Sequence, residues 1–135
     1  MIKNIVICSD GTGNTFSKHV SNITRLIKSV ELDKPDQQVV FYDQGIGTNP
    51  ELVKEVEAYQ NEPGKSRKGL TILPPPQNKF LEPLTRMRGL LFGYGLRDNV
   101  REMYKALAEN YNGEKDQIFP LALVEVLLPS VYLQG

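Results

Sequence analysis

Apolar residues along the chain form two uninterrupted runs and several helical repeats. Residues 5–8 and 39–42 are continuous apolar stretches rich in β-branched or aromatic side chains, without the polar alternation of a half-exposed strand. Such runs are typical of strands buried on both faces, as in a parallel sheet covered by helices. Between them, Ser21 is a candidate N-cap of a helix whose apolar residues recur at helical spacing, namely Ile23, Leu26, Ile27 and Val30.

Residues 50–92 give a weaker pattern. Residues 51–60 suit a short helix, residues 62–69 suit a loop, and the three prolines at 74–76 exclude both a helix and a central strand. A long connection inside a compact domain is usually a lid, a binding loop or a disordered excursion. We therefore interpret residues 50–92 as a long variable excursion and a candidate lid.

A last helix is predicted after residues 93–95, capped by Asp98 or Asn99 and ended by Asn112-Gly113. We expect it to bury its apolar stripe, which consists of Val100, Met103, Tyr104, Leu107 and Tyr111. Strand, helix, strand, long connection and helix together predict an α/β fold with a parallel sheet. In such sheets the loops at the carboxyl ends of the strands line the ligand crevice.

Composition narrows the class of protein. The 135 residues suit one domain, and 16 basic against 16 acidic side chains leave no net charge. This balance argues against a nucleic-acid or membrane-surface binder, which would need a positive surplus. The single Cys8 excludes an intramolecular disulfide framework. Without a leader peptide or an apolar run of bilayer length, we expect a cytoplasmic protein with no transmembrane segment.

Two glycine-rich turns follow the two predicted strands and are the candidate functional loops. Glycines let backbone amides approach a ligand, where they can stabilise an oxyanion or hold a phosphate. An equally open alternative is a tight turn in which the first aspartate binds its own backbone. The first loop offers Asp10, Gly11, Thr12, Gly13 and Asn14 as oxyanion or substrate-binding candidates, and the second offers Asp43, Gly45, Gly47 and Thr48.

Three better-known motifs do not fit the first turn. A dinucleotide fingerprint needs a third glycine where Phe16 stands, and a Walker loop needs Lys and a hydroxyl residue where Asn14-Thr15 stand. An aspartyl-phosphate phosphatase would need its nucleophilic Asp at the position of Cys8. His19, the single histidine, has no partners at metal or triad spacing, so we expect a surface or capping role. We expect no metal and no cofactor.

Four segments, taken in order, resemble one protein family. They are Ile-Val-Ile-Cys-Ser-Asp-Gly-Thr-Gly-Asn at 5–14, Ser-Asn-Ile-Thr-Arg-Leu at 21–26, Val-Val-Phe-Tyr-Asp-Gln-Gly-Ile-Gly-Thr at 39–48 and Gly-Leu-Arg-Asp-Asn-Val-Arg-Glu-Met-Tyr at 95–104. The family is the α/β-hydrolase-like group that includes the first class of type VI secretion phospholipase effectors. The resemblance implies a three-layer fold, hydrolysis of small-molecule or lipid esters by a Ser-His-Asp site, and export without a signal peptide.

The resemblance ends at Phe119. Members of this family continue with a nucleophile elbow, typically Phe-Gly-Phe-Ser-Arg-Gly-Ala, which presents the serine on a sharp strand-to-helix turn. Here residues 120–126 read Pro-Leu-Ala-Leu-Val-Glu-Val, and no Gly-x-Ser-x-Gly follows. We therefore interpret residues 1–119 as the N-terminal part of an incomplete parallel-sheet α/β-hydrolase-like domain and residues 120–135 as a tail foreign to the family. The chain then contains no catalytic nucleophile, acid or histidine of that site.

A shifted reading frame explains this tail. If the last base of each codon is joined to the first two of the next, the junctions from residue 120 onward permit Phe-Gly-Phe-Ser-Arg-Gly-Ala-Phe-Thr-Val-Arg-Leu-Leu-Ala-Gly. That text is the elbow and following helix of the family. A divergent or designed C-terminus is the alternative.

Two other classes of function stay open. The chain can be a non-catalytic interaction fragment, and the apolar edge of an incomplete sheet would favour self-association. It can also be a phosphate-binding module that uses the glycine-rich turns.

Overall fold

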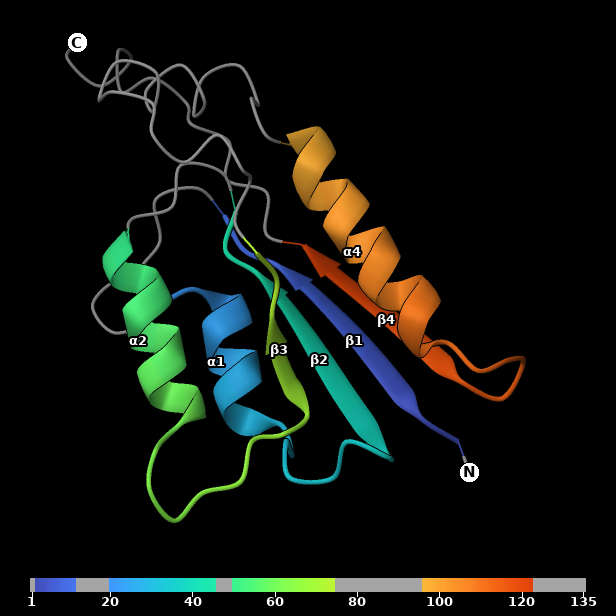
Figure 1. Ribbon diagram of the computed structural model, residues 1–135, viewed down its shortest axis with the longest axis horizontal. Coiled ribbons are helices and arrows are strands. Elements are labelled where there is room, and N and C mark those ends of the chain that lie inside the picture. Colours follow the sequence, from blue (N-terminus) through green and yellow to red (C-terminus); the bar gives the residue numbers. More distant parts are fainter. Residues whose placement is uncertain (1, 12–19, 46–49, 75–95, 123–135) are drawn as a thin grey trace, which may run out of the picture.

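The fold is built around β1, the central strand of a parallel sheet (Figure 1). A computed structural model describes residues 2–11, 20–45, 50–74 and 96–122. The four strands lie in the order β3-β2-β1-β4, and all three neighbouring pairs are parallel. Their bounds are Asn4–Ser9 for β1, Gln38–Asp43 for β2, Leu70–Ile72 for β3 and Gln117–Ala122 for β4; the helices are α1 at Asn22–Ser29, α2 at Pro50–Gln60 and α4 at Leu96–Asn110.

The two apolar runs form the two central strands, as predicted. In β1, Val6 and Cys8 face the core formed with α1 and α2, whereas Ile5 faces the core formed with α4. In β2, Val40 and Tyr42 alternate with Val39 and Phe41 in the same way. Because both faces of these strands are covered, every position can be apolar and the alternation of a half-exposed strand disappears.

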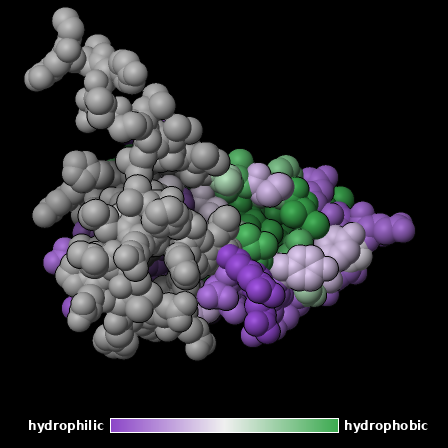
Figure 2. Space-filling view, turned by 90° about the horizontal axis from the view of Figure 1, so that it is seen from above, coloured by the Kyte–Doolittle hydropathy of each residue, from purple (hydrophilic) through white to green (hydrophobic). Residues whose placement is uncertain are grey.

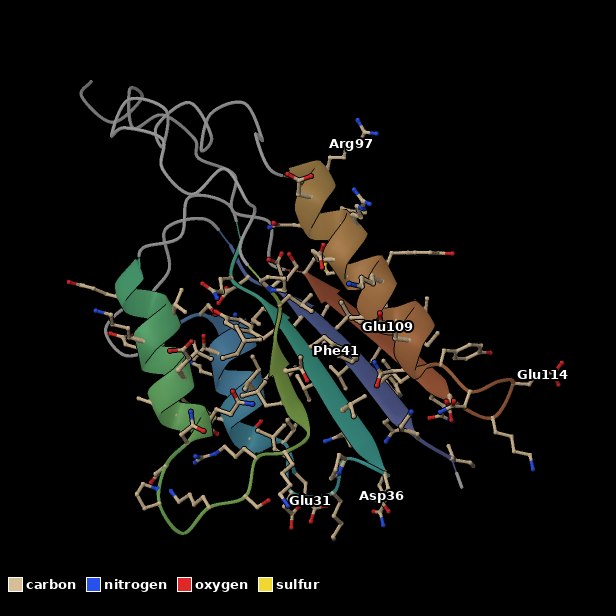
Figure 3. All side chains as sticks on the ribbon, viewed as in Figure 1. Glu31, Asp36, Phe41, Arg97, Glu109 and Glu114 are labelled. Atoms are coloured by element: carbon tan, nitrogen blue, oxygen red, sulfur yellow. The ribbon has the colours of Figure 1, made fainter. Side chains whose placement is uncertain are left out.

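Helices cover both faces of the sheet and give a three-layer α/β architecture. Figure 1 shows α1 and α2 on one side of the sheet and α4 on the other. In Figure 3, Phe41 lies between the sheet and α4, whereas Arg97 points away from the molecule. The predicted fold class, an incomplete parallel-sheet three-layer fold, is confirmed. No helix in the part of the chain that the structure describes is long and apolar enough to cross a membrane.

Helix α1 begins at the predicted cap. The Ser21 side chain accepts a hydrogen bond from the Thr24 amide at 3.0 Å, which satisfies one of the unpaired donors of the first turn. Ile23 and Ile27 are buried against the sheet, and Leu26 and Val30 pack beside them. The helical spacing of these four residues therefore predicted both the helix and its buried face.

The stretch after β2 is more regular than the sequence suggested. Helix α2 agrees with the prediction for residues 51–60, but β3 was not predicted because three residues carry no readable periodicity. Between them, Arg67 lies 3.7 Å over the ring of Tyr59 and donates to the Tyr59 carbonyl and to the Glu62 carboxylate. Residues 50–74 therefore include a sheet strand and its covering helix, and the candidate lid at 75–92 lies outside the described residues.

Helix α4 differs from the prediction in its start. The helix begins at Leu96, so Asp98 lies in its first turn and Asn99 lies within it. Neither residue is the N-cap that the sequence suggested. Asn99 is instead buried, with 4% of its surface exposed, and points toward the end of β2.

The buried face of α4 also differs from the prediction. Val100, Tyr104 and Tyr111 are 51%, 72% and 42% exposed, whereas Ala106 is buried and Met103 packs beside it. The apolar residues span a wide arc of this helix, which allows two orientations about one residue apart. The buried hydrogen bond of Asn99 and the small side chain of Ala106 favour the orientation that the structure adopts.

The order of the strands creates a switch point beside β1. The chain progresses from β1 through β2 to β3, then crosses the other face of the sheet through α4 and adds β4 on the opposite side of β1. The loops that follow β1 and β4 therefore begin at neighbouring strand ends. In open α/β sheets, this is where ligands bind.

Matched valine substitutions test the orientation of α4. Val56→Ala in α2 removes a fully buried side chain and should lower the free energy of unfolding by about 1.5–3 kcal/mol. Val100→Ala in α4 should change it by less than about 0.5 kcal/mol, because that side chain is half exposed. Urea titration followed by circular dichroism measures both. A large loss for Val100→Ala would contradict the orientation of α4.

Candidate functional site

Two buried aspartates lie at the carboxyl edge of the sheet, one on each face. Asp10 follows β1 and Asp43 ends β2, and each is only 4% exposed. Their backbones are joined, because the Asp10 amide donates to the Asp43 carbonyl at 2.9 Å. The two predicted glycine-rich turns therefore start from one rigid point beside the switch point.

The Asp10 carboxylate ties the first turn to α1 and β2. One oxygen accepts from the Gly11 amide at 2.8 Å, and the other accepts from the hydroxyls of Ser21 at 2.8 Å, Tyr42 at 2.9 Å and Thr24 at 3.4 Å. Burial, followed by the charge of Asp10, raises the pKa of the Tyr42 phenol, which therefore stays protonated as a donor. Asp10 thus binds its own backbone, the alternative that the sequence left open.

This contact changes the list of oxyanion donors. Because the Gly11 amide donates to Asp10, it is engaged within the protein rather than aimed at a ligand. The other candidates in this loop, Thr12, Gly13 and Asn14, lie outside the described residues, as does His19. Asp10 therefore acts as a support of the loop, and the donor roles of the remaining residues stay predictions.

The Asp43 carboxylate joins β1, β2 and α4 on the other face. One of its oxygens accepts from the Ser9 hydroxyl at 3.0 Å and from the Asn99 side-chain amide at 3.1 Å. Burial raises the pKa of this carboxyl, while the hydrogen bonds from Ser9, the Gly45 amide and Asn99 oppose the rise. The start of α4 is thereby held to the ends of the two central strands.

Sequence reasoning did not identify Ser9 and Asn99 as members of this cluster. The available signal was a polar residue at the end of a buried strand and an amide on the sheet-facing side of a helix. Neither is informative until the face of α4 is known, because Asn99 was assigned only as a helix cap.

Gly45 brings the second predicted turn against the first. Its φ of 77° lies in the left-handed region, and a Cβ added there would stand 2.5 Å from the Asp10 carbonyl oxygen and 2.9 Å from that of Gly11. Only glycine allows both the backbone conformation and this close approach. Gly47 and Thr48 of the same turn lie outside the described residues.

Cys8 is a core residue, as predicted. Its side chain is fully buried, and burial, followed by the charge of Asp10, raises its pKa to about 11. A thiol with this pKa is protonated at neutral pH, so Cys8 is not a nucleophile in the folded protein.

The end of β4 lies next to the first turn. In the parallel pairing of β1 with β4, Cys8 is opposite Leu121 and Ser9 is opposite Ala122. The position after Ala122 is therefore next in register to Asp10. Any residue presented by a turn at the end of β4 would meet the loop that Asp10 supports.

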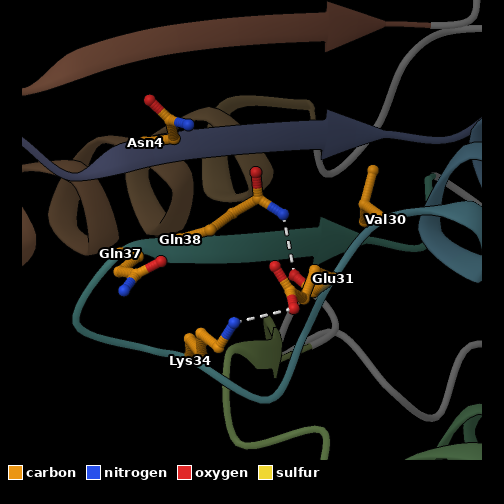
Figure 4. A pocket seen from close by; sticks show the side chains of 6 residues that line it. All are labelled: Asn4, Val30, Glu31, Lys34, Gln37 and Gln38. Carbon is orange, nitrogen blue, oxygen red and sulfur yellow. Dashed lines mark hydrogen bonds and ion pairs between the residues drawn. The ribbon is translucent and has the colours of Figure 1, made fainter.

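Other features of the described residues do not extend this site. They include no group of three or more His, Cys, Asp or Glu residues that could hold a metal ion. A cavity of about 250 Å³ lies near the amino ends of β1 and β2 (Figure 4). Its lining includes the Lys34–Glu31 ion pair at 3.0 Å, and it opens at the edge of the sheet opposite the two aspartates.

These features define a parallel three-layer α/β protein with a rigid loop platform at its switch point. The family model described as "T6SS, Phospholipase effector Tle1-like, catalytic domain" matches residues 3–121. The chain therefore belongs to this family of phospholipase effector catalytic domains. No curated protein and no solved structure matches the chain.

The buried Asp43 predicts a pH-dependent stability. Because its pKa is raised above the usual 3.8, the folded state binds this proton more tightly than the unfolded state does. The contribution of Asp43 to stability is therefore largest below pH 3.8 and is lost as the pH rises through the folded-state pKa. Asp43→Asn should remove this loss, so the variant gains stability relative to the natural chain between about pH 4 and pH 7.

Urea unfolding at several pH values measures the difference between the two proteins. Asp36→Asn is the matched control for removal of a carboxylate from an exposed position. A constant difference between the natural chain and Asp43→Asn across this range would show that Asp43 does not titrate differently in the folded state.

The raised pKa of Cys8 predicts slow alkylation. At pH 8, iodoacetamide should modify Cys8 in the folded chain at least about 100-fold more slowly than in the urea-unfolded chain, because the reactive species is the thiolate. Mass spectrometry of timed samples measures both rates. Similar rates in the two states would show that the strand bearing Cys8 is accessible.

Proposed function

We propose that this chain carries the loop platform of a Ser-His-Asp carboxylic-ester hydrolase site that acts on lipid esters, and that it is catalytically incomplete. The observation that carries the proposal is the pairing of β1 with β4, which brings the first glycine-rich turn beside the strand end from which the nucleophile elbow of such hydrolases extends. Membership in a phospholipase effector family supports the reaction class.

In such a site, the serine attacks the acyl carbon, the histidine moves the proton and the acid orients the histidine. Negative charge develops on the carbonyl oxygen and is stabilised by backbone amides, one beside the serine and one from the neighbouring loop. With the Gly11 amide engaged by Asp10, we assign the loop donor to Thr12, Gly13 or Asn14. Asp10 and Gly45 hold the start of that loop in place.

The incompleteness rests on the residues that follow Phe119. β4 continues through Ala122, yet residues 120–126 contain no Gly-x-Ser-x-Gly. The shifted reading frame would replace Leu123 by serine, one position beyond the residue that pairs with Ser9. That position is next in register to Asp10, which is where a nucleophile must lie to use the loop donors.

Sequencing the coding DNA from codon 117 onward tests the frame hypothesis. The codon junctions should spell the elbow and the helix that follows it. If they do not, the tail is a true divergence and the frame hypothesis is wrong.

An esterase assay tests the function. The purified chain should hydrolyse p-nitrophenyl esters no faster than the buffer, because loss of the nucleophile lowers the kcat of a triad enzyme by about 10⁶-fold. The protein expressed from the restored frame should be active, and replacement of its elbow serine by alanine is the matched control. Turnover by the chain as it stands, retained on repeated purification, would refute the incomplete site. Thermal stabilisation by inorganic phosphate, without turnover in either protein, would favour a phosphate-binding module instead.

A further inference from the structure

Strand β4 is an exposed edge of the sheet. All six of its residues are exposed, and Ile118, Phe119 and Leu121 are 40%, 43% and 38% exposed. Among the described residues it pairs with β1 alone. The opposite edge, β3, has three residues, and its Leu70 is only 1% exposed. The open edge of the sheet is therefore β4.

The outward side of β4 offers backbone groups at alternate residues. The Gln117 amide donates to the Lys3 carbonyl at 2.9 Å, so this residue faces β1. In a parallel strand the direction alternates, which turns Phe119 and Leu121 toward β1 and turns Ile118, Pro120 and Ala122 outward. Pro120 has no amide hydrogen, and its outward position explains how the ladder with β1 accommodates a proline.

The edge carries little protection against pairing with another strand. Proteins usually protect edges with charged side chains, prolines, bulges or a covering segment. From Gln117 to Ala122 there is no charged residue, and Pro120 is the only such protective feature in the strand. Figure 2 shows hydrophobic surface gathered mainly into one area of this side of the molecule, bordered by hydrophilic side chains.

We propose that β4 pairs with β4 of a second copy of this chain, antiparallel and centred on Pro120. In this register Ile118 of each copy lies opposite Ala122 of the other, and each such pair exchanges two backbone hydrogen bonds. The two sheets join into one continuous sheet across a two-fold axis. The pairing closes on itself, because both copies use the same strand.

Charge and strand length select this occupant. An uncharged edge offers nothing to attract a charged peptide, and a chain with 16 positive and 16 negative side chains has no net charge to repel its own copy. Head-to-tail pairing of β4 with β3 would build an open filament, but β3 offers only three residues. A contact through six residues is small, so the dimer is weak and reversible.

Two proline changes test the pairing in opposite directions. Pro120→Val supplies an outward amide at the centre of the two-fold contact, adding one hydrogen bond from each copy, and should tighten the dimer about tenfold. Ala122→Pro removes an outward amide that the ladder with β1 does not use, and should weaken it about tenfold or more. Sedimentation velocity of the full chain over a wide concentration range measures both dissociation constants.

Two lysine substitutions separate the strand from the neighbouring helix. Ile118→Lys places a charge on the edge and should give a monomer at every concentration, whereas Tyr104→Lys on the exposed side of α4 should leave the dimer unchanged. Far-UV circular dichroism and the urea midpoint show whether each variant is folded. If Ile118→Lys does not fold, the opposite shifts of Pro120→Val and Ala122→Pro decide the question.

Three results would overturn the proposal. They are a natural chain that stays monomeric at all concentrations, a dimer that Tyr104→Lys disrupts and Ala122→Pro does not, and growth beyond the dimer without a plateau. The last result would indicate head-to-tail pairing of the two sheet edges.

Discussion

The buried Asp10 carboxylate is the interaction on which the functional end of this molecule depends. It sits at the last turn of the central strand and accepts hydrogen bonds from the next amide and from three hydroxyl groups on α1 and β2. A buried carboxylate is tolerated only when such donors replace the water it has lost. The direction in which the first loop leaves the sheet is therefore set by this carboxylate.

Asp43 has the corresponding role on the other face of the sheet. It links Ser9 at the end of β1 with Asn99 in α4, while Gly45 brings its turn within reach of the backbone of Asp10. The two aspartates together fix both glycine-rich turns and the start of α4 around one point. A platform of this kind suits a hydrolase, because oxyanion donors stabilise a transition state only when they are held in place beforehand.

Prediction from sequence succeeded where burial was uniform and failed where it was shared. The central strands and α1 were correct because runs such as residues 39–42 have no other explanation than burial on both faces. β3 was missed because three residues are too short for a periodic pattern. The face of α4 was wrong because its apolar residues form an arc wide enough for two orientations, and Val100 and Tyr104 belong to the exposed one.

The amino-acid sequence by itself determined the class of fold, the two candidate loops, the family resemblance and the departure from the family after Phe119. These depend on local patterns and ordered motifs, which can be read along the chain. The tertiary structure decided which side chains meet: that the Gly11 amide is engaged by Asp10, that Ser9 and Asn99 share Asp43, and that the end of β4 lies beside the first loop. Such contacts join residues far apart in the chain, and local patterns do not record which helix face or which strand neighbour the packed core selects.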